Sequence, residues 1–202
     1  GLPISDASVL GVDSLSFSEV GTDTRQRLKT ALSMGNEQRS LDLLTGAYTM
    51  GQNLAALADD YLAPALRDIG DLWNHSEEGI LIEHRATDIC FRGLRLIQDL
   101  IPQPADDAPV AIGCAPGGDV YIIPSLMLGM LFQEKGFHAI NIGADTPIEI
   151  LAMAVNKYRP SAVWISFSTD EPKEDDAAGD IVDLAKQITP LGSHIFVGGR
   201  TV

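Results

Sequence analysis

The chain has 202 residues, 45% of them apolar, and a formal net charge of −14 at pH 7. This length suits one large domain or two small ones, each with a buried core. The acidic balance would repel phosphate backbones, so we expect no direct nucleic-acid binding and a regulatory output, if any, through a protein partner or a separate domain. Neither a membrane span nor a signal peptide is visible, which favours a cytoplasmic protein that makes no membrane contact.

The first half of the chain is predicted to be helical. Residues 1–23 are rich in Gly, Ser and Asp without a sustained period, and are expected to form a disordered tail. Apolar residues then recur with helical spacing over residues 25–34, 40–50, 54–73 and 80–101. Short breaks separate these stretches, which predicts a four-helix bundle, or cap domain, over residues 24–101. Pro64 lies inside the third helix and should kink it.

The second half changes period after a Pro-rich linker at residues 102–107. Strands are expected at 110–114, 139–142, 162–166 and 194–197, and helices at 123–133, 148–157 and 177–188. This alternation predicts a doubly wound parallel, flavodoxin-like α/β domain over residues 109–202, truncated before a fifth strand. Ligands of such sheets bind at the carboxyl ends of the strands, here the loops 115–121, 143–147 and 166–172.

The two cysteines, Cys90 and Cys114, each lie in an apolar segment. A role in packing is therefore expected, in preference to a disulfide or redox chemistry.

The helical half carries one spaced set of polar and aromatic residues. Trp73 precedes the pair Glu83-His84 by nine intervening residues, and His84 shares a helix face with Thr87 and Phe91. Taken alone, these residues fit a core tryptophan and a hydrogen-bonded core histidine.

The α/β half carries small and polar residues after its strands. Gly118-Asp119-Val120-Tyr121-Ile122 follows the first strand, Ser166-Phe167-Ser168 ends the third, and Gly198-Gly199 ends the fourth. Glycine and serine at strand ends leave space for a ligand between sheet and helix. Alone, Gly198-Gly199 fits an ordinary turn.

The spacing of Trp73 and Glu83-His84, with the flanking residues 62–72, resembles the cobalamin-binding regions of photoreceptor regulators of the CarH type. The resemblance extends over about residues 24–202. It implies that Trp73, Glu83 and His84 cover the upper face of adenosylcobalamin. It places Gly118, Asp119, Val120, Tyr121 and Ile122 beneath the ring, and Ser166, Ser168, Gly198 and Gly199 along a channel for the nucleotide tail.

Two residues depart from that family's pattern. Tyr121 stands where the lower axial histidine is expected, and Pro124 stands where a glycine is expected. A phenol is a poor ligand for Co(III) beside an imidazole. Three readings stay open: cobalamin without a protein ligand below, weak ligation by Tyr121, or a changed ligand. Related domains hold haem or a bilin such as biliverdin, tyrosine can ligate ferric haem, and His75 offers a second imidazole.

We therefore expect a non-enzymatic sensory module that binds a tetrapyrrole, with cobalamin-dependent light sensing and transcription regulation as the leading reading. A protein partner or a homo-oligomer would receive the signal. The alternatives are a haem- or bilin-binding sensor of the same fold, or a corrinoid carrier for a methyltransferase system. A degenerate module that serves only in protein contacts is a third reading.

Overall fold

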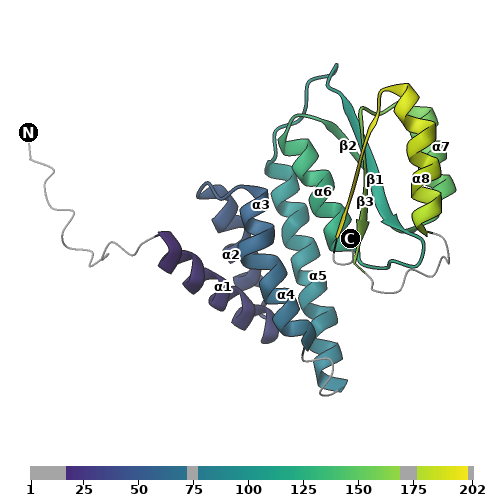
Figure 1. The fold of residues 1–202 in the computed structure, drawn as a ribbon. Helices are drawn as coiled ribbons and strands as arrows, with labels where there is room; N and C mark the ends of the chain where they lie inside the picture. The colour runs from purple at the N-terminus through teal and green to yellow at the C-terminus, as the bar shows by residue number, and fades with distance from the viewer. Residues whose placement is uncertain (1–16, 72–76, 169–176, 200–202) are drawn as a thin grey trace, which may run out of the picture.

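The computed structural model of the chain describes residues 17–71, 77–168 and 177–199. The helical half contains α1 (Phe17–Ser33), α2 (Glu37–Thr49), α3 (Leu54–Ala56), the π-helical turn η2 (Leu57–Leu62), α4 (Ala63–Gly70) and α5 (Glu77–Leu100). These helices lie side by side in Figure 1 and form the predicted cap. The predicted tail extends too far, because residues 17–23 belong to α1.

The third predicted helix is continuous to Gly70 but irregular before its proline. Pro64 has no N–H to donate, so the preceding carbonyls lose a regular partner. The helix widens into the π turn η2 before Pro64, and the N–H of Ala63 donates to the carbonyl of Ala58. The irregularity predicted at Pro64 is thus a π turn on its N-terminal side.

The second half contains β1 (Val110–Pro116), α6 (Ile122–Glu134), β2 (His138–Thr146), α7 (Ile148–Tyr158), β3 (Ala162–Phe167), α8 (Ala177–Ile188), the 3-10 turn η4 (Thr189–Leu191) and β4 (His194–Gly199). All strand pairs are parallel and their order is β2-β1-β3-β4. Helix α6 covers the sheet face towards the cap, and α7 and α8 cover the opposite face (Figure 1). The predicted α/β architecture is confirmed.

One predicted loop is instead part of a strand. Residues 143–146 belong to β2, whose pairing with β1 shifts register between Gly113 and Cys114. The shift keeps β2 paired as far as Thr146, opposite Pro116. Both strands therefore carry their last residues to the same edge of the sheet.

Helix α6 belongs to the core of both halves. Its Leu126, Met127 and Met130 are buried in one apolar cluster with cap residues such as Leu94 and Ile97. A separate cluster lies under α7 and α8 on the other sheet face. The cap is thus docked on the sheet domain through buried side chains of α6.

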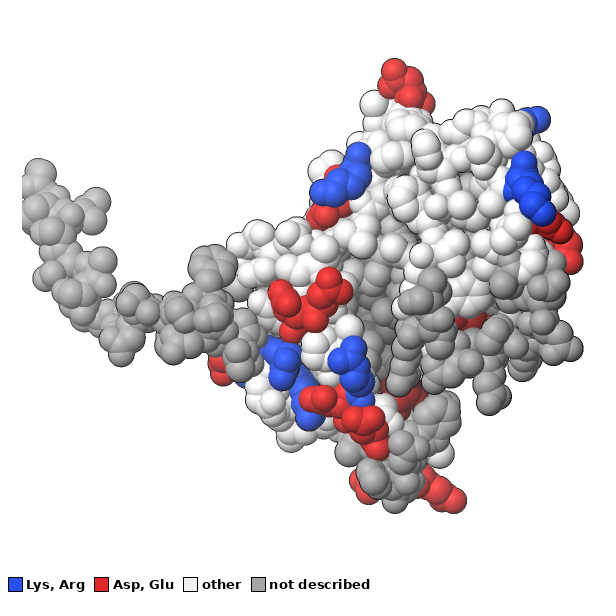
Figure 2. Space-filling view, in the orientation of Figure 1, with Lys and Arg blue, Asp and Glu red and all other residues white. Residues whose placement is uncertain are grey.

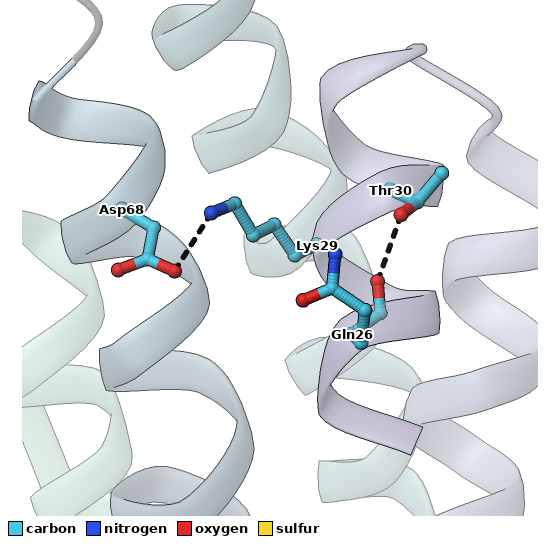
Figure 3. A network of polar contacts seen from close by, with 4 residues as sticks. All are labelled: Gln26, Lys29, Thr30 and Asp68. Atoms are coloured by element: carbon cyan, nitrogen blue, oxygen red, sulfur yellow. Dashed lines mark hydrogen bonds and ion pairs between the residues drawn. The ribbon is translucent and has the colours of Figure 1, made fainter. Parts of the chain in front are cut away.

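A polar contact also joins two helices within the cap. Lys29 on α1 donates to the carboxylate of Asp68 on α4 over 2.8 Å, as Figure 3 shows. This hydrogen bond is the main cause that lowers the pKa of Asp68. Both side chains are partly exposed, so we expect the pair to add little to the free energy of folding.

Mixed charges gather over the cap in Figure 2, while the sheet domain is largely uncharged in that view. Among the described helices, none combines the length and apolar character needed to cross a membrane.

Both cysteines are buried free thiols in different apolar clusters. Burial raises the pKa of Cys90 and of Cys114 to about 12. We expect neither thiol to react with an alkylating reagent at pH 8 until the protein unfolds, as counted by mass spectrometry. Because the folded pKa lies above the unfolded value, the thiols favour folding below about pH 9, and this contribution falls as pH rises towards 12. Rapid labelling of the native protein would contradict this prediction.

Candidate functional site

A buried carboxylate organises the loop that follows β1. Asp119 is fully buried. One of its oxygens, Oδ2, accepts the backbone N–H of Ser168 over 2.6 Å, and Oδ1 accepts the N–H of Tyr121 over 3.0 Å. Its carbonyl oxygen accepts the N–H of Asp145 over 2.8 Å. Asp119 therefore ties the loop after β1 to the ends of β2 and β3.

Asp145 completes this connection and was not predicted from the sequence. Its Oδ1 accepts the backbone N–H of Gly118 over 2.7 Å. The only signal in the sequence was its position at the carboxyl end of a strand, where polar side chains serve ligand sites. Together the two aspartates fix the backbone on which the next three residues stand.

Those three residues are apolar or aromatic and face outwards. Val120 is 65% exposed, Tyr121 46% and Ile122 38%. Tyr121 is the N-cap residue of α6 and makes no side-chain capping bond. Three adjacent exposed apolar residues on a fixed loop are typical of a binding surface.

A cleft of about 380 Å³ separates this loop from the cap. Its lining residues come from α5, from the loop after β1 and from the first residue of α6: Glu83, His84, Thr87, Asp88, Phe91, Val120, Tyr121 and Ile122. The cleft has the size and the mixed polar and apolar lining of a small-molecule site. The structure thus brings the predicted Glu83 and His84 opposite the predicted residues 120–122. Asp88 was missed, although it lies one helical turn after His84.

Two polar contacts of Glu83 lie on the α5 side of the cleft. Thr87 donates to Glu83 Oε1 over 3.0 Å, and His84 Nε2 lies 3.6 Å from Glu83 Oε2. The His84 side chain is 69% exposed, so it is not the buried histidine that the helical stripe suggested. The imidazole therefore lies at the rim of the cleft, beside the Glu83 carboxylate.

The ends of β3 and β4 form a second, adjoining part of the site. Ser166 is buried, and its hydroxyl has no hydrogen-bond partner among the described residues. It pairs with Gly198, and no described atom lies within 4 Å of where a Cβ on Gly198 would stand. Because buried hydroxyls are rarely left unpaired, this one indicates a missing polar partner beside an open space. The predicted role of Ser166 and Gly198 along a tail channel stays a prediction.

Gly199 lies at a close approach of two strand ends, and its predicted place in a tail channel stays a prediction. Its φ of 143° suits glycine, and a Cβ there would overlap the backbone of Phe167 on β3. The residue allows two strand ends to approach each other, and it faces no open space in the described structure. Ser168 contributes its backbone N–H to Asp119, as described above.

Two candidates lie outside the described residues, namely Trp73 and His75. Across residues 17–71, 77–168 and 177–199, no group of three or more His, Cys, Asp or Glu side chains is arranged to hold a metal ion.

Comparison with known proteins points to one ligand class. The family described as "B12 binding domain" matches residues 24–98. The HTH-type transcriptional repressor CarA of Myxococcus xanthus is 31% identical over 147 residues, which cover 73% of this chain and 48% of that protein. The chain thus spans about half the length of this curated relative.

A solved structure shares the fold. The monomethylamine corrinoid protein of Methanosarcina barkeri superposes with a TM-score of 0.66 at 16% identity, covering 90% of this chain and 86% of that one. At this identity the likeness shows the fold alone. The matches name B12 and corrinoid proteins, and they give no support to haem or biliverdin as the ligand.

Proposed function

We propose that this chain is the sensory module of a light-responsive regulator. The premise is that residues 24–98 match the B12 binding domain family and that the chain has a cobalamin-binding fold with a helical cap. The observation that carries the proposal is the cleft between α5 and the loop after β1. A ligand held there touches the cap and the sheet domain at once. Its chemical state can therefore bias their relative position, provided that it binds the two arrangements with different affinity.

Each side of the cleft has a definite part in holding the ligand. Val120, Tyr121 and Ile122 offer an apolar surface to one face of a corrin ring. Glu83 and His84 offer polar groups to the other face and to the amide side chains of its rim. Ser166 supplies a hydroxyl to the phosphate-bearing tail.

Adenosylcobalamin is the proposed form, because its cobalt–carbon bond is broken by light. The protein's own task is to bind the ring, to exclude water from the cleft, and to transmit a change in occupied volume from α5 to the rest of the cap. The proposal includes no catalytic step by a residue of this chain.

A regulatory role is preferred to a methyl carrier for two reasons. The similar protein from Myxococcus xanthus is named a transcriptional repressor, and its identity of 31% carries more information than a shared fold. A carrier needs a lower ligand that tunes cobalt through its oxidation states, whereas Tyr121 offers a phenol there. The net charge of −14 favours a protein partner or self-association as output, over direct DNA contact by this segment.

Titration of the purified protein in the dark tests the ligand assignment. We expect adenosylcobalamin to bind with a change in its absorption spectrum and to raise the Tm. A ligand at 100 times its dissociation constant adds about 2.7 kcal/mol to the free energy of unfolding. An unchanged spectrum together with an unchanged Tm would refute cobalamin binding.

Size-exclusion chromatography in dark and light tests the sensory role separately. The ligand-loaded protein should change its elution volume, or its affinity for a partner, after illumination. Identical behaviour in both conditions would leave a protein that binds cobalamin without sensing light.

The residue at the lower face can be probed through the spectrum of the bound ligand. Tyr121 stands at the N-terminus of α6 and lines the cleft. We expect Tyr121→His to shift the absorption of bound cobalamin towards that of histidine-ligated cobalamin, since an imidazole is the better cobalt ligand. Tyr121→Phe is the control and should leave the spectrum unchanged. If Tyr121→His also leaves it unchanged, residue 121 does not reach the metal.

A further inference from the structure

The sheet face that packs against α6 is open at the carboxyl ends of β3 and β4 and is filled by an indole further back along β3. At the strand ends, Ser166 and Gly198 are paired, and they border the open space described above. One step back along the same face, about 6.6 Å at the usual rise per residue, Trp164 is paired with Phe196. Over β3 the open part of this face therefore ends at the buried Trp164.

The indole of Trp164 is fixed in place. It is fully buried, and its Nε1 donates to Ser125 Oγ on α6 over 3.1 Å. Ser125 in turn donates to Asn141 Oδ1 on β2 over 2.8 Å. The ring of Phe132 stacks on the indole with centroids 5.3 Å apart and an interplanar angle of 22°. A side chain held by a hydrogen bond, a ring stack and complete burial is part of the rigid core.

Two glycines leave the space that this indole occupies. On β1, a Cβ at Gly113 would overlap the ring of Trp164, and on α6 a Cβ at Gly129 would stand 3.4 Å from it. Phe132 also packs edge-on against Phe196, with centroids 5.8 Å apart. The indole of Trp164, a flat bicyclic ring, thus fills the space between α6 and the sheet at this point.

We propose that the tail channel of this site ends at Trp164, and that no bicyclic lower base is accommodated beneath α6. This inference rests on the proposed cobalamin-binding function. The site would bind the corrin ring and the part of the tail that reaches Ser166, while the base at the end of the tail contributes little to affinity. Its ligand class would then be corrinoids with a phosphate-bearing tail, irrespective of the lower base.

The wild-type protein tests this directly. Adenosylcobalamin is compared with the adenosyl form of a phenolyl cobamide, which keeps the corrin ring and the phosphate-bearing tail and differs only in its smaller, monocyclic lower base. The two dissociation constants are measured by absorbance titration in the dark. We expect the two constants to agree within about threefold, because the part of the ligand that differs finds no pocket. A preference for adenosylcobalamin above tenfold would overturn the inference while supporting the proposed function. Failure of both ligands to bind would contradict the proposed function and this inference with it.

Substitution of the indole tests its role as the end of the channel. Trp164→Ala removes the ring and should create a preference of about tenfold or more for adenosylcobalamin, whereas Trp164→Phe keeps a stacked ring and should preserve near-equal binding. Circular dichroism checks that each variant folds. A folded Trp164→Ala protein that still binds the two ligands equally would show that Trp164 does not exclude the base. If that variant does not fold, the wild-type comparison and Trp164→Phe still decide.

Discussion

Asp119→Asn should destabilise the protein by about 2–4 kcal/mol and weaken cobalamin binding more than tenfold. The carboxylate uses its two oxygens to accept two backbone N–H groups, from Tyr121 and Ser168. An amide has one acceptor oxygen, and its NH₂ group would face a donor. Hydrogen bonds to a charged group contribute about 1.5–3 kcal/mol, and a buried N–H left unpaired costs about 1–3 kcal/mol. Urea denaturation and ligand titration measure the two effects.

Asp145→Asn is the matched control for this substitution. Asp145 accepts a single N–H, from Gly118, through one oxygen. Asparagine keeps one acceptor oxygen, so we expect a loss below about 1 kcal/mol and nearly unchanged affinity. If the two variants behave alike, charge in the loop matters and the two-sided bonding of Asp119 does not. If neither variant changes affinity, the loop after β1 does not position the ligand.

Most of the fold could be predicted because its signals are local. The change from helical to strand period near Pro102 separated the two halves, and α8 begins and ends where periodicity placed it. Two predicted boundaries were wrong, the start of the first helix and the end of the second strand. The start of α1 at Phe17 carries no apolar stripe, and β2 continues through Gly143 to Thr146 because of a register shift against β1. Pairing of that kind depends on the neighbouring strand and leaves no mark on the local sequence.

The site could be predicted in its residues but less well in its interactions. Glu83, His84 and residues 120–122 do line one cleft. Asp119 was predicted as a site residue, but its two N–H donors, from Tyr121 and Ser168, were not. They lie on loops that only the folded sheet brings together. Trp164 was read as part of a strand, because nothing local indicates that its indole fills the space beneath α6. Contacts between distant segments were the information that the sequence alone did not supply.

Met130→Ala should loosen the cap and lower the free energy of unfolding by about 2–5 kcal/mol. Met130 on α6 is fully buried in the cluster that joins α6 to the cap. Truncation of a buried methionine removes apolar contacts and leaves a cavity. Met153→Ala on α7 is the control, because Met153 is 62% exposed and its loss should change stability by less than about 0.5 kcal/mol. Urea denaturation compares the two variants.

Hydrogen exchange on the same pair of variants asks whether the cap can move as a unit. Signalling by cap displacement requires the buried contacts of Leu126, Met127 and Met130 to break while the sheet stays folded. If the cap is such a unit, Met130→Ala should lower protection of the α5 amides more than that of the β1 and β3 amides. It should also shift the dark elution volume towards the illuminated one, because weaker docking favours the displaced cap. Equal loss of protection in cap and sheet would mean that the two unfold together, and a ligand in the cleft would then have to signal without moving the cap.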